Sequence, residues 1–190
     1  MKRILYSVLI TVTVIALGAC ASVASPSNEV IADDVSIQPT TAEPMQAFSS
    51  DQLDLCFSYP QGYTLLPESE TVEIIGPALP DTDLKAIFWL EINDADDRTA
   101  EVIADQELTA AGGIDVDRST LTVGGEQAVM LDGMPGQDLQ RRVNVVHQQS
   151  FYMLGFMPTR SGNSAAADQM EALYSAVTSS WAWSPCPAGE

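Results

Sequence analysis

Basic side chains are scarce in this sequence. Lysine and arginine together account for 8 of the 190 residues, against 26 aspartates and glutamates, and the formal net charge at pH 7 is −18. A surface that binds nucleic acid or anionic lipid needs lysine and arginine to neutralise phosphates. The composition therefore argues against a nucleic-acid partner and against direct docking of the folded domain on anionic lipid. It is typical of a highly soluble domain.

Histidine is scarcer still, because His147 is the only one in the chain. A serine or cysteine nucleophile needs a neighbouring base, and the sequence contains no G-x-S-x-G motif. Zinc sites need histidine and cysteine ligands, and the glycine-rich motifs of phosphate-binding loops are also missing. We therefore predict no catalytic residue, no bound cofactor and no zinc. We expect His147 on the surface, at the end of a strand.

Carboxylates are the one abundant functional group. Two carboxyl groups about 5–10 Å apart in a pocket can support hydrolysis, so a carboxylate-dependent hydrolase is the alternative to a non-catalytic domain. Asp94, Asp96 and Asp97 could supply oxygens to a weak Ca²⁺ site, although their spacing does not match an EF-hand loop. These aspartates also precede a predicted helix, and negative charge is favoured at a helix N-terminus.

The N-terminus has the layout of a secretory signal peptide. The basic start "MKR" is followed by an uncharged apolar run at residues 4–17 and then by small residues before Cys20. An uncleaved membrane helix is the alternative, but a span needs about 20 predominantly apolar residues. The segment "LGAC", residues 17–20, resembles the lipobox of bacterial lipoproteins. This resemblance implies removal of residues 1–19, acylation of Cys20 (palmitate among the acyl groups), and anchoring to the extracytoplasmic face of a membrane.

The chain after the signal peptide divides into two segments. Residues 20–50 are rich in serine, threonine, proline and acids, with no sustained apolar period. Such a segment cannot bury enough apolar surface to offset its ordering entropy, which predicts a flexible linker. Residues 51–190 have the length of one domain and enough apolar residues for a core. We therefore predict a signal peptide at 1–19, a lipidated cysteine with its linker at 20–50, and a single domain at 51–190.

Apolar periods predict the fold of this domain. Residues 53–59 alternate as in a half-buried strand, whereas residues 84–92 are apolar on both faces, which predicts a strand covered on both sides. A helix is expected between an N-cap at Asp97 or Thr99 and a stop at Gly112. The apolar face of a second helix carries Met170, Leu173, Val177 and Trp181. The order β-β-β-α-β-β-β-α predicts an α+β domain with an antiparallel sheet of about six strands and packed helices.

Two cysteines are left when Cys20 carries lipid, and they are Cys56 and Cys186. Compartments outside the cytoplasm favour disulfides. We therefore predict a Cys56–Cys186 bridge, with two separate buried thiols as the alternative.

Arg141 and Arg142 are adjacent on one predicted strand, so their side chains point to opposite faces of the sheet. We expect one of them to pair with acids across the sheet, and a role in anion binding is the alternative. The aromatic candidates for a binding surface are Trp89, Tyr152, Trp181 and Trp183, of which Trp89 and Trp181 are expected in the core.

The segment "FSYPQGY", residues 57–63, resembles the opening strand and turn of the PsbP/DcrB/LpqN-like superfamily. The Gly-Gly hairpin before "EQAVML", the strand "SFYMLGF" and the closing "VTSSWAW" follow in the same order, so the resemblance covers about residues 53–184. It implies a PsbP-like α/β sandwich and an exported accessory protein, because members are commonly exported or lumenal and several are lipoproteins. No functional residue of PsbP is matched. We therefore predict a lipid-anchored envelope protein with a non-catalytic binding or assembly domain, whose partner is an unidentified envelope protein or small ligand.

Overall fold

The computed structural model describes residues 44–68, 71–80, 82–159 and 164–186. The predicted signal peptide, Cys20 and most of the predicted linker lie outside these residues, so their assignments stay predictions. Within the described residues, no helix is both long enough and apolar enough to cross a membrane.

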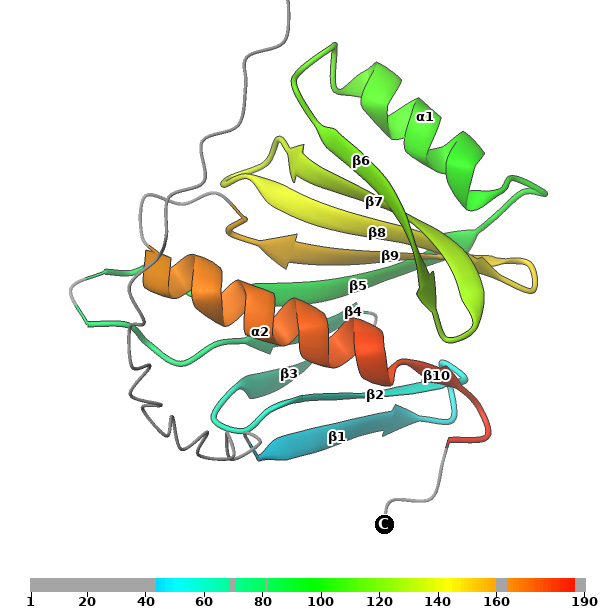
Figure 1. Ribbon diagram of the computed structural model, residues 1–190. Helices are drawn as coiled ribbons and strands as arrows, with labels where there is room; N and C mark the ends of the chain where they lie inside the picture. Colours follow the sequence, from blue (N-terminus) through cyan, green and yellow to red (C-terminus); the bar gives the residue numbers. More distant parts are fainter. Residues whose placement is uncertain (1–43, 69–70, 81, 160–163, 187–190) are drawn as a thin grey trace, which may run out of the picture. The chain divides into compact units, whose positions relative to one another are not determined.

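The described strands form two sheets (Figure 1). The smaller sheet has the order β1-β2-β10, with β1 at Met45–Ser50, β2 at Leu55–Pro60 and β10 at Ala182–Trp183. The larger sheet has the order β3-β4-β5-β9-β8-β7-β6. Its seven strands are β3 (Thr64–Glu68), β4 (Thr71–Ile75), β5 (Ile87–Asp94), β6 (Asp117–Val123), β7 (Glu126–Met134), β8 (Gln140–His147) and β9 (Ser150–Met157). All pairings between the described strands are antiparallel.

Two helices, α1 at Ala100–Ala110 and α2 at Ser164–Ser180, pack on the larger sheet. Side chains alternate between the faces of a strand, and α2 packs with Val143 and Val145 whereas α1 packs with Val129 and Leu131 of the neighbouring strand. Val143 stands between Met130 and Leu154 in register, so it shares a face with Met130 and not with Val129. The helices therefore lie on opposite faces. The predicted antiparallel α+β fold is confirmed, with seven strands in the larger sheet where about six were expected.

Strand β1 lies inside the segment that the sequence predicts to be a linker. Its backbone pairs with β2 over its whole length, and the Phe48 ring stacks on Phe57 with the ring centroids 4.9 Å apart. The predicted linker boundary at residue 50 is therefore wrong for residues 45–50. Three of these six residues, Met45, Ala47 and Phe48, are apolar, and the strand is held by its backbone hydrogen bonds to β2 and by the Phe48 ring contact.

The main core lies between α2, the smaller sheet and one face of the larger sheet. Phe57 joins these layers, because its ring also stacks on Trp181 after α2 at 5.3 Å and meets the edge of Phe88 on β5 at 5.4 Å. The predicted apolar face of α2 is buried, since the exposed fractions of Met170, Leu173, Val177 and Trp181 are 5% or less.

A smaller core lies under α1, on the other face of the larger sheet. Of the two predicted N-cap candidates, Asp97 and Thr99, the cap is Thr99, whose side-chain oxygen accepts a hydrogen bond from the Val102 amide at 3.4 Å. Gly112 follows the helix with φ +77°, as the predicted stop requires. Because α1 contacts β7 and β8, no described helix covers β4, β5 and the adjoining part of β9 on this face. The expectation that β5 is covered on both sides is therefore wrong, and Ile87 and Trp89 are half-buried.

Candidate binding groove on the open face of the sheet

A groove of about 330 Å³ lies on this open face. Strands β4, β5 and β9 supply its floor, and the segment between β7 and β8 supplies one wall. The lining residues are Thr71, Glu73, Ile87, Trp89, Glu91, Gln137, Gln140 and Met157. These described residues combine one aromatic ring, one aliphatic side chain, one thioether, one hydroxyl, two carboxylates and two amides, and no lysine or arginine is among them.

Trp89 is the one aromatic residue among the described residues that line the groove. It stands opposite Gly155 in the β5–β9 register, and a Cβ atom built on Gly155 would overlap ring atoms of the indole. The ring therefore rests on the glycine backbone of the neighbouring strand, a position that a larger residue would close. Because Trp89 is half-buried, this contact leaves part of the indole accessible from the groove.

Glu73 and Glu91 flank Trp89 on the same face. Glu73 is the register partner of Trp89 on β4, and Glu91 lies two residues along β5 from Trp89. The Nε1–H group of Trp89 donates a hydrogen bond to Glu91 Oε1 at 3.2 Å. Among the described residues, no lysine, arginine or histidine nitrogen lies within 4.0 Å of either carboxylate. Both negative charges are therefore uncompensated by an ion pair.

Gln140, one of the lining residues, belongs to a hydrogen-bonded network that reaches α1. Arg142 pairs with Glu107 of α1 at 3.2 Å and donates to Gln140 Oε1 at 3.0 and 3.2 Å. The buried Asn144 side chain donates to the second oxygen of Glu107 at 2.6 Å. The positive charge of Arg142 is thereby matched by Glu107, and Gln140 is held in position.

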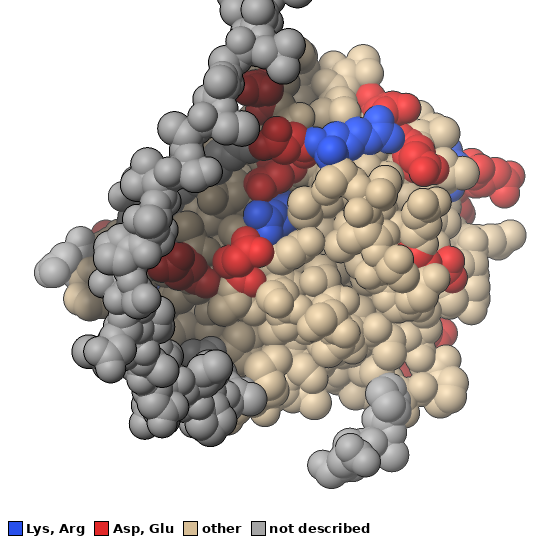
Figure 2. Space-filling view, in the orientation of Figure 1, with Lys and Arg blue, Asp and Glu red and all other residues tan. Residues whose placement is uncertain are grey.

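Arg141 points to the opposite face, as predicted, and bonds Asp132 at 3.0 Å and Glu171 of α2 at 2.7 Å. Its guanidinium also lies over the ring of Tyr174, 4.4 Å from the centroid. Both arginines thus pair with acids, where the sequence predicts a pair for one. Figure 2 shows the face that carries α2, where the visible basic side chains lie beside acidic ones.

The other aromatic candidates do not line this groove. Trp181 and Tyr152 are buried, with exposed fractions of 5% and 6%. Trp183 stacks on His147 at 4.2 Å, and His147 Nδ1 lies 2.9 Å from Glu126 Oε1. His147 does stand at the end of a strand, but it is half-buried in this cluster.

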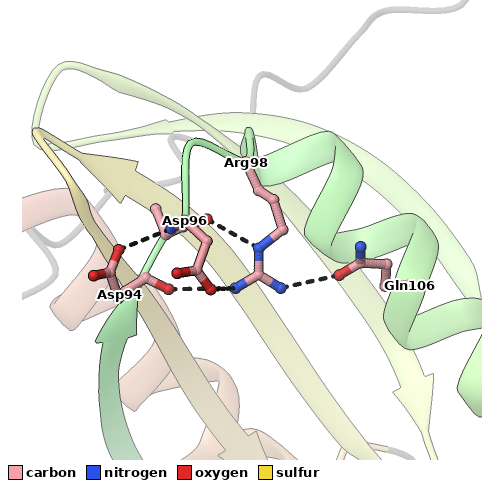
Figure 3. A network of polar contacts seen from close by, with 5 residues as sticks. Asp94, Asp96, Arg98 and Gln106 are labelled. Atoms are coloured by element: carbon pink, nitrogen blue, oxygen red, sulfur yellow. Dashed lines mark hydrogen bonds and ion pairs between the residues drawn. The ribbon is translucent and has the colours of Figure 1, made fainter.

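Two of the three aspartates considered for Ca²⁺, Asp94 and Asp96, contact Arg98 (Figure 3). Arg98 donates to Asp96 Oδ2 at 3.1 Å, to the backbone oxygen of Asp94 at 3.3 Å and to Gln106 Oε1 at 3.1 Å. The Asp94 carboxylate accepts from the Asp96 amide at 2.8 Å. The Asp96 carboxylate is thus paired with a cation from its own chain, and the Asp94 carboxylate is used by the backbone of the loop. Within the described residues, no group of three His, Cys, Asp or Glu side chains is arranged to hold a metal ion.

Cys56 and Cys186 form a disulfide, with their Cα atoms 6.0 Å apart. The bridge connects β2 to the segment after β10, and the Ser184 amide donates to the Asp54 carbonyl at 2.8 Å beside it.

A second hollow, of about 520 Å³, lies beside the first half of α2. The Tyr63 hydroxyl donates to the Gln169 backbone oxygen there at 2.8 Å. Asp168 is the one carboxylate among the described lining residues, and most of the others are apolar. A pair of carboxylates in one depression therefore occurs in the Trp89 groove and not in this hollow.

Sequence reasoning missed the groove because it placed Trp89 in the core. The alternation of Ile87, Trp89 and Glu91 with Phe88 and Leu90 contains the signal, since it puts Glu91 on the same face as Trp89. The groove also requires Gly155 to stand opposite Trp89. That position depends on the pairing of β5 with β9, which the local sequence does not show.

No protein-family model matches the chain, and no curated protein matches it. Among solved structures, PsbP from the cyanobacterium Synechocystis is 14% identical over 78% of this chain and 97% of its own, with a TM-score of 0.46. LpqN from Mycobacterium tuberculosis, described as involved in cell envelope biogenesis, is 19% identical over 76% of this chain and 87% of its own, with a TM-score of 0.48.

A protein from Bacteroides thetaiotaomicron is 12% identical over 73% of this chain, with a TM-score of 0.46, and the chain spans about half, 48%, of that protein's length. PsbP and LpqN bear names of the superfamily that the sequence resembles. Because all three TM-scores are below 0.5, these likenesses carry no argument about ligand or activity.

Proposed function

We propose that this chain is a lipid-anchored envelope protein whose α+β domain binds a ligand in the Trp89 groove without catalysing a reaction. The groove carries the proposal, since an accessible indole, aliphatic walls and a few convergent polar groups are the usual composition of a small-ligand site. The lining includes Trp89, Ile87 and Met157 with Glu73 and Gln140. A side chain as large as tryptophan is more often buried. Its partly accessible position on an open sheet face therefore favours a binding role.

The extracytoplasmic location is supported by the sequence "LGAC" ending at Cys20 and by the Cys56–Cys186 disulfide. Disulfides persist in oxidising compartments. Cys20→Ser should abolish acylation, and incorporation of labelled palmitate measures this. Unchanged incorporation in Cys20→Ser would contradict the anchor while leaving the groove untouched.

A site-specific photo-crosslinking experiment in cells tests the groove. A photo-reactive amino acid at Gln137, which is exposed and lines the groove, should give an adduct in the full-length protein. The adduct should disappear when Trp89→Ala is added. The matched control position is Val102, which is 43% exposed on α1 outside the groove and should give no such adduct. Equal labelling at Gln137 and Val102 would contradict the proposal. So would labelling at Gln137 that is unchanged by Trp89→Ala.

A carboxylate-dependent hydrolase is the second candidate, and one observation favours it. Glu73 and Glu91 lie on neighbouring strands in the same groove. Binding is preferred because Glu91 is exposed to solvent, whereas catalytic charges act most strongly where water is excluded. A hydrolase screen of the full-length protein, with and without Ca²⁺, should be flat. One turnover that is lost in Glu73→Gln or Glu91→Gln would establish the second candidate instead.

A further inference from the structure

We propose that the Trp89 groove recognises an alkylated ammonium group, such as the quaternary ammonium of a small molecule. The inference rests on the proposed binding function of the groove and adds the chemical class of its ligand. The argument uses the two carboxylates, the indole ring and the apolar walls in turn.

The charge of the groove selects a cation. Glu73 lies beside Trp89 on β4 and Glu91 lies two residues further along β5, and neither has an ion-pair partner among the described residues. The nearest arginine in the register, Arg142, is already matched by Glu107. A bound anion would meet two like charges with no compensating donor of positive charge, whereas a cation would be attracted by both.

The indole adds a second attraction for the same charge. Tryptophan is the best aromatic partner for a cation placed over its ring face. In this protein the ring is supported from below by Gly155 and oriented by the hydrogen bond from its Nε1–H group to Glu91. The same hydrogen bond holds the Glu91 carboxylate beside the edge of the ring. The aromatic face and the negative charge are therefore fixed relative to each other before a ligand arrives.

The walls exclude a bare metal ion and favour an alkylated cation. A hard cation such as Ca²⁺ takes six to eight oxygen ligands, as is general for that ion, and no group of three acidic, histidine or cysteine side chains is arranged for a metal in the described residues. Ile87 and Met157 supply aliphatic contacts instead. A primary ammonium is a strongly hydrated point charge, so burying it against these side chains costs more than burying methyl groups. A quaternary ammonium matches both the charge and the apolar surface.

Titration of the full-length chain in dodecyl maltoside, a detergent without an ammonium group, tests this assignment. The probes are choline, its neutral isostere 3,3-dimethylbutanol, and n-butylammonium as a model of a lysine side chain. The readout is the NMR signal of the Trp89 indole N–H, which Trp89→Phe identifies among the three tryptophans. Choline should shift this signal in a saturable and salt-sensitive manner. It should bind more tightly than n-butylammonium, and the neutral isostere should not bind.

Substitutions locate the effect. Glu73→Gln and Glu91→Gln should each weaken choline binding about two- to fivefold, the range of exposed ion pairs. Trp89→Ala lacks the reporting indole, so its affinity is measured by calorimetric titration beside the unsubstituted protein, and it should be about tenfold weaker or more. Glu101→Gln is the matched control, because it removes the same charge from an exposed position on α1 and should leave the affinity unchanged.

Several outcomes would overturn the assignment. Equal binding of the neutral isostere would mean that apolar contact, and not charge, carries recognition, and tighter binding of n-butylammonium would replace the quaternary ligand with a primary amine. If no ammonium compound binds but the Gln137 adduct still depends on Trp89, the ammonium assignment fails and the proposed binding function stands. If neither is observed, the groove is not the site.

Discussion

The indole of Trp89 rests on the backbone of Gly155, its register partner on the neighbouring strand. This contact positions the one tryptophan that lines the open face of the larger sheet in the described residues. It also makes the shape of the groove depend on a residue that has no side chain.

Gly155→Ala should therefore displace the indole. The added Cβ overlaps the ring, and overpacking of this kind costs about 1–3 kcal/mol. Denaturant unfolding measures the loss, and the shift of the Trp89 indole N–H signal reports the displacement. The cost should shrink in a Trp89→Ala background, because that substitution removes the overlapping ring. An equal cost in both backgrounds would mean that the alanine clashes with something other than Trp89.

Phe57→Ala should lower the free energy of unfolding by about 3–5 kcal/mol, as for other buried aromatic side chains. The ring is 2% exposed and contacts Phe48, Phe88 and Trp181, so its removal leaves a cavity where the two sheets and α2 meet. Phe151→Ala is the control, since Phe151 is half-buried on the open face and its loss should be smaller. A change below about 1 kcal/mol at Phe57 would contradict its central position.

Cys56 and Cys186 should resist alkylation until a reductant is added, and a non-reducing peptide map should recover their peptides joined. The two residues are 130 apart in sequence, and a loop of this size stabilises the fold by up to about 4–5 kcal/mol in the chain-entropy model. The double variant Cys56→Ala/Cys186→Ala should unfold at a correspondingly lower denaturant concentration. Full alkylation of both thiols without reductant would refute the bridge.

Stability should fall at alkaline pH in a manner that depends on Tyr174. Burial raises the pKa of the Tyr174 hydroxyl above its usual value near 10, although the nearby Arg141 opposes this rise. A group with a raised pKa in the folded state stabilises the fold below the unfolded pKa. That contribution is lost as the pH rises from about 10 through the folded pKa.

Urea unfolding at several pH values above about 9 compares the protein with Tyr174→Phe. The variant should lose less stability over this range because it has no hydroxyl to ionise. If the free energy of unfolding falls equally with pH in the two proteins, Tyr174 does not contribute to the alkaline loss of stability. Burial also raises the pKa of Tyr152, so a residual alkaline loss in the variant is expected.

Several parts of the fold could be read from local sequence. The buried face of α2 follows from residues spaced at i, i+3 and i+7, because helical geometry alone brings them together. Thr99 and Gly112 mark the limits of α1 through their own backbone preferences. The disulfide partners follow from counting cysteines, once Cys20 is assigned to the anchor.

Strands held by distant partners could not be read in this way. β1 mixes three apolar and three polar residues without a sustained alternation, and it becomes a strand because β2 offers it backbone donors and acceptors. β10 has two residues, and it exists because the chain after α2 returns alongside Cys56 and Leu55. Such pairings depend on the proximity of segments far apart in the chain, and no local period records that proximity.

Composition and local order already fix the charge of this protein, the scarcity of catalytic nitrogen and sulfur groups, and the periods of its main strands and helices. Which of these residues meet depends on how the strands pair and where the helices pack. Trp89 reads as a core residue because its neighbours are apolar, yet it lines a groove because α1 covers β7 and β8 and stops short of β5. Glu73, Gly155 and Gln140 join it there through strand register, which hydrogen bonding across the whole sheet sets and no single segment contains.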